Sequence, residues 1–285
     1  MTQRLALAAP AKINLFLHIS GRRDDGYHLL ESVFVPVSLA DTVTLTLRSD
    51  GVIRLLDPPE GITAANDLAC RAARALQAAT GTPLGVDIQL VKRIPQGAGL
   101  GGGSADAAAT LLGLNRLWKL SRSRVELQDI GAALGADVPF FVFGLPALAQ
   151  GIGEKLRAVT LPVTHLVIAN PGVSVATNAV FGHPALTRNT PPLRTPVFSM
   201  DYGRNDLQRV AAILAPPIDQ LRRAFVAAGA TPKMTGSGSC VFALARCAHE
   251  ALQLQVALAR DGWRAWAVHT LATHPLYCFA DSAII

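Results

Sequence analysis

The pattern of apolar and polar positions predicts two strands in the first third of the chain. Residues 42–47 read TVTLTL and residues 86–90 read VDIQL. Both segments alternate apolar and polar side chains with a period of two, which is typical of a half-buried strand. The second segment leads directly into a glycine-rich loop.

Helical segments follow each of these strands. The alanine-rich segment 68–79 begins after Asn66, a good N-cap residue, and ends near Gly81. Residues 104–118 form a second expected helix. Ser123 and Glu126 have the spacing of a capping box, which predicts a third helix to Leu134.

The second half of the chain also predicts both helices and strands. We expect a proline-rich loop at 184–196, a helix at 218–228 closed by Gly229, and another helix at 249–260. Strands are expected at 165–170, 240–245 and 263–268. Strands in clusters separated by helices indicate an α+β fold with two subdomains, 1–150 and 151–285, and a site in the cleft between them.

Composition narrows the class of protein. Of the 285 residues, 50% are hydrophobic and 16% are charged, which favours a compact globular enzyme over a disordered chain. No apolar run approaches the ~20 residues of a membrane span. Lys12 and Asn14 interrupt the N-terminal segment before it could form the apolar part of a signal peptide. We therefore expect a cytoplasmic protein, as a monomer or a weak homodimer.

Charge and cysteines point to small anionic ligands and a reducing compartment. The net charge is +6, but basic residues form no run longer than an adjacent pair, such as Arg22-Arg23 and Arg222-Arg223, and have no interleaved aromatics, which disfavours nucleic acid. Four scattered cysteines, each among apolar neighbours, predict buried reduced thiols: Cys70, Cys240, Cys247 and Cys278.

The glycine-rich segment 95–106, PQGAGLGGGSAD, is the strongest functional signal in the chain. Glycine backbone can converge several N–H groups on one anion, and the following helix adds its own free amides. A flexible linker is the alternative, but the flanking strand and apolar helix disfavour it. The segment satisfies G-x-G-x-x-G, which alone is a weak signal.

Three common nucleotide-binding classes fail to match this loop. A dinucleotide-binding fold needs a second strand where the capping box opens a helix. The Walker motif needs a Gly-Lys pair, and the chain contains none. Protein kinases need His-Arg-Asp and Asp-Phe-Gly, which are both missing.

Two further segments make the chain resemble the GHMP kinases. They are residues 10–15, PAKINL, and 235–242, TGSGSCVF, in the order that the family has them. Residues 24–28, 135–139 (GADVP) and 170–174 (NPGVS) are similar to the branch of that family acting on a cytidine diphosphate-linked methylerythritol. The resemblance extends from about residue 8 to the C-terminal strand region.

This resemblance implies a two-subdomain GHMP kinase fold that binds ATP with Mg²⁺. It implies that the adenine lies near Asn66 and Lys92, and that Ser104 reaches the metal ion. No acidic residue stands in the place of the glutamate that helps bind metal in some relatives. The triphosphate is expected along the loop, at Pro95, Gly97, Ala98, Gly99, Leu100, Gly101, Gly102, Gly103, Ser104 and Ala105.

Lys12 and Asp137 are the expected catalytic pair. Lys12 stands among apolar residues, and its alternative is an ordinary lysine at a strand start. Pro139 is expected to keep Val138 extended, which would leave Asp137 at a turn after the helix. The alternative to a catalytic Asp137 is an aspartate that only stabilises a turn or caps a helix. Asn14 lies on the same strand face as Lys12, so it could bind substrate or hold Lys12.

The expected acceptor site combines aromatic and small residues. Tyr27 offers a stacking face and His28 a donor and an acceptor for cytosine. For these two residues the alternative is a hairpin tip with a surface aromatic. The resemblance implies that Phe181 lies on the other side of the cytosine, and a phenylalanine in the core is the alternative there. The resemblance adds further substrate-binding residues, for which a tight turn is the alternative at the glycines: Asn14, Thr177, Gly236, Ser237 and Gly238.

The sequence therefore predicts an ATP-dependent kinase for a small alcohol, with no nucleic-acid or membrane partner. The resemblance implies transfer to the 2-hydroxyl of the methylerythritol group, in the non-mevalonate route to isoprenoid precursors. A mevalonate or homoserine kinase is one alternative, and a non-catalytic nucleotide-binding regulator is another. His18, His165 and His274 lack metal-ligand spacing and are interpreted as structural.

Overall fold

The computed structural model describes residues 3–58, 63–193 and 199–280. Its strands are β1 (Arg4–Arg22), β2 (His28–Arg48), β3 (Ile53–Leu56), β4 (Gly85–Val91), β5 (Ala147–Gln150), β6 (Lys155–Ala158), β7 (His165–Asn170), β8 (Pro232–Met234), β9 (Val241–Ala245) and β10 (Arg264–His269). Its helices are α1 (Leu68–Thr80), α2 (Gly102–Leu117), α3 (Arg124–Ala132), α4 (Val138–Phe143), α5 (Thr177–Gly182), α6 (Gln208–Leu214), α7 (Pro217–Ala227), α8 (Ala248–Arg260) and the short 3₁₀ helix η1 (Tyr277–Phe279).

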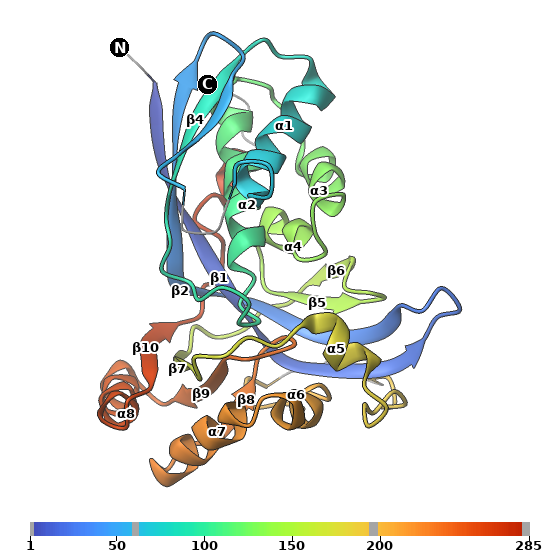
Figure 1. Ribbon diagram of the computed structural model, residues 1–285, viewed down its shortest axis with the longest axis vertical. Coiled ribbons are helices and arrows are strands. Elements are labelled where there is room, and N and C mark those ends of the chain that lie inside the picture. Colours follow the sequence, from blue (N-terminus) through green and yellow to red (C-terminus); the bar gives the residue numbers. More distant parts are fainter. Residues whose placement is uncertain (1–2, 59–62, 194–198, 281–285) are drawn as a thin grey trace.

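The first half is a sheet covered by helices. Its strands run in the order β3-β4-β2-β5-β6, with β1 paired to β2, and only the β3–β4 pair is parallel. Helices α1 to α4 gather on one face of this sheet (Figure 1), where their apolar side chains form a continuous core with β1, β2 and β4. The N-terminal end of α2 points toward the middle of the molecule.

The second half is a four-stranded antiparallel sheet in the order β10-β7-β9-β8. Helices α6, α7 and α8 pack on one face of it and close a second core. The opposite face packs against the middle of β1 and β2 in a third core. The α+β class with two halves is confirmed, and the long β1–β2 hairpin belongs to both of them.

The alternation at 42–47 reveals only the end of this hairpin. β1 spans 19 residues and β2 spans 21. Residues 9–17 of β1 are all buried, because helices or the second sheet cover both sides of the strand. A strand buried on both faces shows no polar–apolar alternation, so periodicity cannot find it. Register shifts between Pro10 and Lys12, and again between Asn14 and Leu17, mark irregularities that re-aim side chains.

Most expected helix ends are confirmed, with one correction at α1. The capping box of Ser123 and Glu126 is present at α3, and Gly81 ends α1 in the left-handed region. Asn66 as the N-cap of α1 is wrong. The helix begins at Leu68, so Asp67 occupies the capping position and accepts a hydrogen bond from the Cys70 amide at 2.9 Å.

The expectation of an extended Val138 is also wrong. Val138 is the first residue of α4, and Pro139 lies in the first turn of that helix. Proline fits there because the N–H that it lacks would have no intrahelical partner. Asp137 therefore takes the N-cap position of α4.

Three remaining sequence expectations concern cysteines, the proline-rich loop and membranes. Cys70 and Cys240 are buried, but Cys247 and Cys278 are exposed, so the expectation of burial is wrong for two of the four cysteines. Cys247 lies just before α8 and Cys278 in η1, at positions that local hydropathy does not distinguish. Residues 184–193 contain no helix or strand, and residues 194–196 lie outside the described residues. No helix in the described ranges is long and apolar enough to cross a membrane.

His274 gives the fold a measurable pH dependence. Burial lowers the pKa of this side chain from 6.5 to about 4. Below pH 6.5 the unfolded chain binds a proton that the folded chain excludes, so stability falls as the pH drops toward 4. This difference amounts to a loss on the order of 3 kcal/mol.

The test is urea unfolding between pH 7.5 and 4.5. The Nδ1 atom of His274 accepts from the Leu276 amide at 3.1 Å, and an Asn amide oxygen can replace this acceptor. His274→Asn should lose less stability on acidification than the wild type. His269→Asn, at an exposed histidine, is the control and should behave like the wild type. Equal pH dependence in all three proteins would contradict the assignment to His274.

Candidate active site

A cavity of about 630 Å³ lies where the N-terminal end of α2, strand β1 and the segment 235–239 meet. Its wall contains most of the residues singled out from the sequence: Lys12, Asn14, Asn66, Lys92, Pro95, Gly97, Ala98, Gly99, Gly101, Gly102, Gly103, Ser104, Asp137, Thr177, Phe181, Gly236, Ser237 and Gly238. Leu100 and Ala105 are buried behind it. The structure thus brings three separate sequence motifs to one place.

The glycine-rich loop presents free backbone donors to this cavity. Helix α2 begins at Gly102, and the amides of Gly102, Gly103 and Ser104 have no acceptor among the described residues. Gly101, the residue before the helix, has a φ of +72°. Free amides at the positive end of a 16-residue helix form a site for an anion such as a phosphate.

Backbone contacts on both sides fix the position of this loop. The Lys12 amide of β1 donates to the Leu100 oxygen at 3.0 Å, and the Cys240 amide donates to the Ala98 oxygen at 3.1 Å. A side chain on Gly99 would overlap the Thr235 carbonyl oxygen, and one on Gly236 would come within 2.8 Å of the Gly99 oxygen. The glycines of the 235–239 segment therefore allow two backbones to touch beside the cavity.

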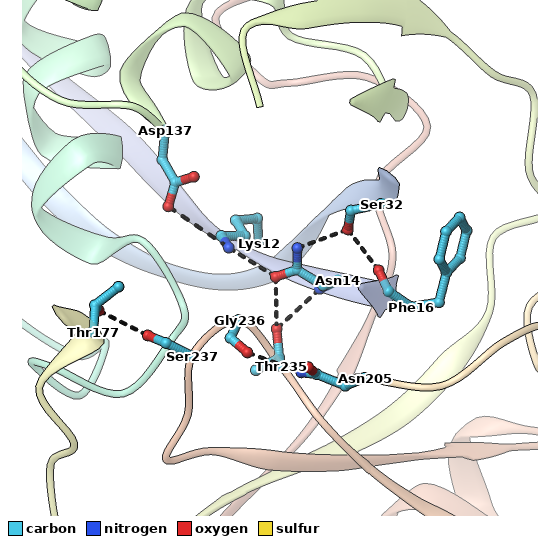
Figure 2. A network of polar contacts seen from close by, with 10 residues as sticks. All are labelled: Lys12, Asn14, Phe16, Ser32, Asp137, Thr177, Asn205, Thr235, Gly236 and Ser237. Carbon is cyan, nitrogen blue, oxygen red and sulfur yellow. Dashed lines mark hydrogen bonds and ion pairs between the residues drawn. The ribbon is translucent and has the colours of Figure 1, made fainter. Parts of the chain in front are cut away.

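Lys12 and Asp137 meet in the cavity wall. Figure 2 shows the Lys12 ammonium between the Asp137 carboxylate and the Asn14 side-chain oxygen. Nζ of Lys12 lies 3.6 Å from Oδ2 of Asp137 and 2.8 Å from the Asn14 oxygen. The same ammonium lies 4.9 Å from the centre of the Phe34 ring, close enough for a cation–π contact. Only 4% of the Lys12 side chain is exposed, so it is not an ordinary surface lysine.

The Asp137 carboxylate is available for chemistry. Although Asp137 occupies the N-cap position of α4, its side chain makes no capping hydrogen bond within the described chain. This finding argues against the alternative of a capping aspartate. Its side chain is 32% exposed, so a ligand in the cavity can reach it while Lys12 holds its other side.

Asn14 holds Lys12 in place. Its side-chain oxygen accepts from Lys12, while its amide nitrogen donates to the Ser32 hydroxyl at 2.8 Å. Its backbone N–H donates to the Thr235 hydroxyl at 2.9 Å (Figure 2). Of the two roles expected for Asn14, these contacts favour the positioning of Lys12, because both ends of the amide already have partners.

Lys92 lies in the cavity wall, but its charge is already compensated. Its ammonium donates to the buried carboxylates of Asp41 and Asp106. Asp41 also accepts from the Ile94 amide at 2.8 Å, which ties the start of the glycine-rich loop to β2. Burial raises the pKa of Asp106, whose Oδ1 atom has no partner in the described chain. Asn66 does not cap α1, since Asp67 takes that position.

Of the two side chains expected to stack on the cytosine, Phe181 lines the cavity and Tyr27 does not. Phe181 lines the cavity, and the His28 ring lies 5.1 Å from it, centre to centre. Tyr27 at the hairpin tip is 60% exposed and, like His28, is not among the described residues that line the cavity. The Thr177 and Ser237 hydroxyls are 2.8 Å apart at the cavity edge, which links α5 to the 235–239 segment.

Comparison with known proteins agrees with this geometry. The family model described as "GHMP kinases N terminal domain" matches residues 67–145, and "GHMP kinases C terminal" matches residues 192–264. A protein from Azoarcus sp. (strain BH72) named 4-diphosphocytidyl-2-C-methyl-D-erythritol kinase is 47% identical over 273 residues, 96% of each chain. The chain belongs to the GHMP kinase family.

Solved structures show the same GHMP kinase architecture. A crystal structure of 4-(cytidine 5'-diphospho)-2C-methyl-D-erythritol kinase has 37% sequence identity and a TM-score of 0.80, over 93% of this chain and 99% of that one. A homoserine kinase from Cytophaga hutchinsonii has a TM-score of 0.69 with 16% identity, over 96% of both chains, and so shares the fold alone.

Several residues that support this GHMP kinase site were not found from the sequence. The sequence shows Thr235 only as part of a motif, although its hydroxyl accepts a hydrogen bond from the Asn14 backbone N–H. Asp106 is visible only as the last residue of the glycine-rich segment, and Phe34, Asp41 and Arg188 have no local pattern to mark them, because their partners are distant in the chain. The described residues contain no group of three or more histidines, cysteines or acidic residues that could hold a metal ion.

Proposed function

We infer that the protein transfers the γ-phosphoryl group of ATP to the 2-hydroxyl of 4-diphosphocytidyl-2-C-methyl-D-erythritol. The observation that carries this proposal is the Lys12–Asp137 pair, 3.6 Å apart beside the free amides of α2. A nucleotide-binding regulator needs the amides but has no use for an accessible carboxylate paired with a buried lysine. The 47% identity to a kinase of this name supports the choice of acceptor.

The residues assign the steps of the transfer. The Asp137 carboxylate accepts the proton of the acceptor hydroxyl, whose oxygen bonds to the γ-phosphorus as the bond to the β-phosphate oxygen breaks and ADP leaves. Lys12 stabilises the negative charge that develops on the acceptor oxygen. The amides of Gly102, Gly103 and Ser104 hold the phosphates in line, which is the main requirement of phosphoryl transfer.

Mg²⁺ fits this site as an ion bound mainly by phosphate oxygens and water. The described residues offer no cluster of three acidic ligands, whereas Mg²⁺ commonly keeps several waters and takes only one or two protein ligands. We propose the Ser104 hydroxyl as a ligand, since it lies at the start of α2 in the cavity wall. The ion would neutralise phosphate charge during the transfer.

The remaining wall suits the nucleotide part of each substrate. Asn66 and Lys92 line the cavity at the end proposed for adenine. Phe181 lines it at the end proposed for cytosine, and His28 packs against the Phe181 ring. Thr177, Ser237 and the neighbouring Gly236 and Gly238 line the same cavity, and we propose that they bind the acceptor substrate. Tyr27 is proposed to stack on the cytosine from the hairpin tip.

One assay tests this function. The protein is incubated with ATP, Mg²⁺ and the cytidine substrate while ADP release is followed, with mevalonate and homoserine in parallel reactions. We expect ADP release only with the cytidine compound. Turnover of a rival acceptor without turnover of the cytidine compound would show that the substrate is misassigned, since homoserine and mevalonate kinases share this fold.

A further inference from the structure

Arg188 connects the two elements that form the proposed cytosine end of the site. It lies in the segment between α5 and α6 and is half-buried. Its Nη2 atom donates to the carbonyl oxygens of Phe181 and His183, both at 2.9 Å, at the end of α5. Its Nε atom donates to Nε2 of His28, the first residue of β2, at 3.0 Å. One guanidinium therefore joins the β1–β2 hairpin to α5.

The contact with Arg188 determines which nitrogen of His28 carries the proton. A guanidinium only donates hydrogen bonds and stays protonated in proteins. Nε2 of His28 must therefore hold a lone pair, which places the ring proton on Nδ1 in the neutral imidazole. No hydrogen bond joins Nδ1 to any part of the chain that the structure describes, so this N–H is a free donor beside the Phe181 ring.

We propose that Arg188 is a positioning residue that makes His28 a hydrogen-bond donor and thereby selects cytosine over uracil in the acceptor substrate. This inference rests on the proposed function, because it takes the base beside Phe181 to be cytosine. Cytosine has an unprotonated N3, which can accept from the Nδ1–H donor; the selective contact is with N3, because O2 is an acceptor in both bases. Uracil carries a hydrogen on N3, so its N3–H would face another N–H and leave both donors without a partner.

The surroundings of His28 keep the ring in this form. Burial, Arg188 and Arg22 all lower the pKa of His28, in that order of importance. A charged imidazolium would carry protons on both nitrogens and would lose the contact with Arg188. Arg188 also donates from Nη1 to the Leu186 oxygen at 3.1 Å, so its four hydrogen bonds fix the guanidinium and, through it, the orientation of the ring.

The tautomer can be measured directly in the wild-type protein. Nitrogen-15 NMR of labelled histidine distinguishes Nδ1–H from Nε2–H, and His28→Gln identifies the signal. We expect Nδ1–H in the wild type and a shift toward the Nε2–H form in Arg188→Met. Arg188→Lys should keep part of the Nδ1–H form, since an ammonium can still donate to Nε2. A wild-type His28 with its proton on Nε2 would overturn the inference.

Kinetics with two substrates test the selectivity. The cytidine substrate and its uridine counterpart are compared in the wild type, Arg188→Met and Arg188→Lys. In Arg188→Met we expect the ratio of kcat/KM between the two substrates to fall about tenfold or more, mainly through KM for the cytidine substrate. Arg188→Lys should recover part of the ratio. Arg222→Met is the control, because Arg222 is also half-buried but pairs with Asp219 on α7.

The outcomes separate this inference from the proposed function. If the wild type turns over the cytidine substrate but Arg188→Met keeps the wild-type ratio, the inference fails and the function stands. If the wild type does not turn over the cytidine substrate, the proposed function fails, and the choice of cytosine fails with it. If Arg188→Met does not fold, the wild-type tautomer and the Arg188→Lys ratio still decide the question.

Discussion

Asp137→Asn is expected to lower kcat by about a thousandfold while leaving ATP binding close to that of the wild type. Asparagine keeps the shape of the side chain but cannot accept the proton of the acceptor hydroxyl, and general-base catalysis commonly contributes about 10²–10⁴-fold. Helix α4 should be unaffected, because the Asp137 side chain makes no capping bond in the described structure. The measurements are steady-state kinetics and the dissociation constant of ATP.

Asp129→Asn is the matched control for this experiment. Asp129 is exposed on the neighbouring helix α3, so the same chemical change there should leave kcat unchanged. An Asp137→Asn enzyme with more than a tenth of the wild-type kcat would remove Asp137 from the role of base. Lost ATP affinity together with lost kcat would instead point to a collapsed cavity.

Gly99→Ala should abolish most ATP-dependent activity by displacing the phosphate-binding loop. Gly99 has a φ of +77°, and its added Cβ would overlap the Thr235 carbonyl oxygen and come within 3.0 Å of the Gly238 oxygen. Both obstacles are backbone atoms that cannot rotate away. We expect kcat/KM for ATP to fall about a hundredfold or more, since a displacement of about 1 Å in such a site is costly. Nucleotide titrations and kinetics measure it.

Gly172→Ala separates the overlap from the backbone strain. Gly172 has the same φ of +77°, but nothing lies within 4 Å of the position of its Cβ. This variant should lose only the ~1–2 kcal/mol of stability expected for alanine in the left-handed region, with normal ATP kinetics. If both variants bind ATP equally well, the close contact between the two glycine segments does not matter for the site.

The sequence was sufficient for the parts of the site that depend on local backbone chemistry. The glycine-rich loop, the capping box of α3 and the pairing of Lys12 with Asn14 follow from spacing that neighbouring residues determine. The meeting of Lys12 with Asp137 is also confirmed, although it rested on the family resemblance as well as on residue type. Loops and strand faces of this kind carry their own signal.

The rest depended on contacts between distant segments. Lys92 was expected at the adenine, but nothing near it in the sequence shows that Asp41 and Asp106 neutralise it. Arg188 lies in a proline-rich loop without periodicity, so its link to His28, 160 positions away, has no local trace. The middle of β1 was hidden for another reason, since burial on both faces removes the alternation that marks a strand.

The β1–β2 hairpin limits how the protein can move. Strand β1 is embedded in the core under α1 to α4 and in the core that faces the second sheet, and Lys12 lies where it passes between them. A hinge that swings one half away from the other would have to break this strand. We therefore expect substrate exchange to rely on small local segments, such as the hairpin tip and α5, and Lys12 and Asp137 to keep their separation through each turnover.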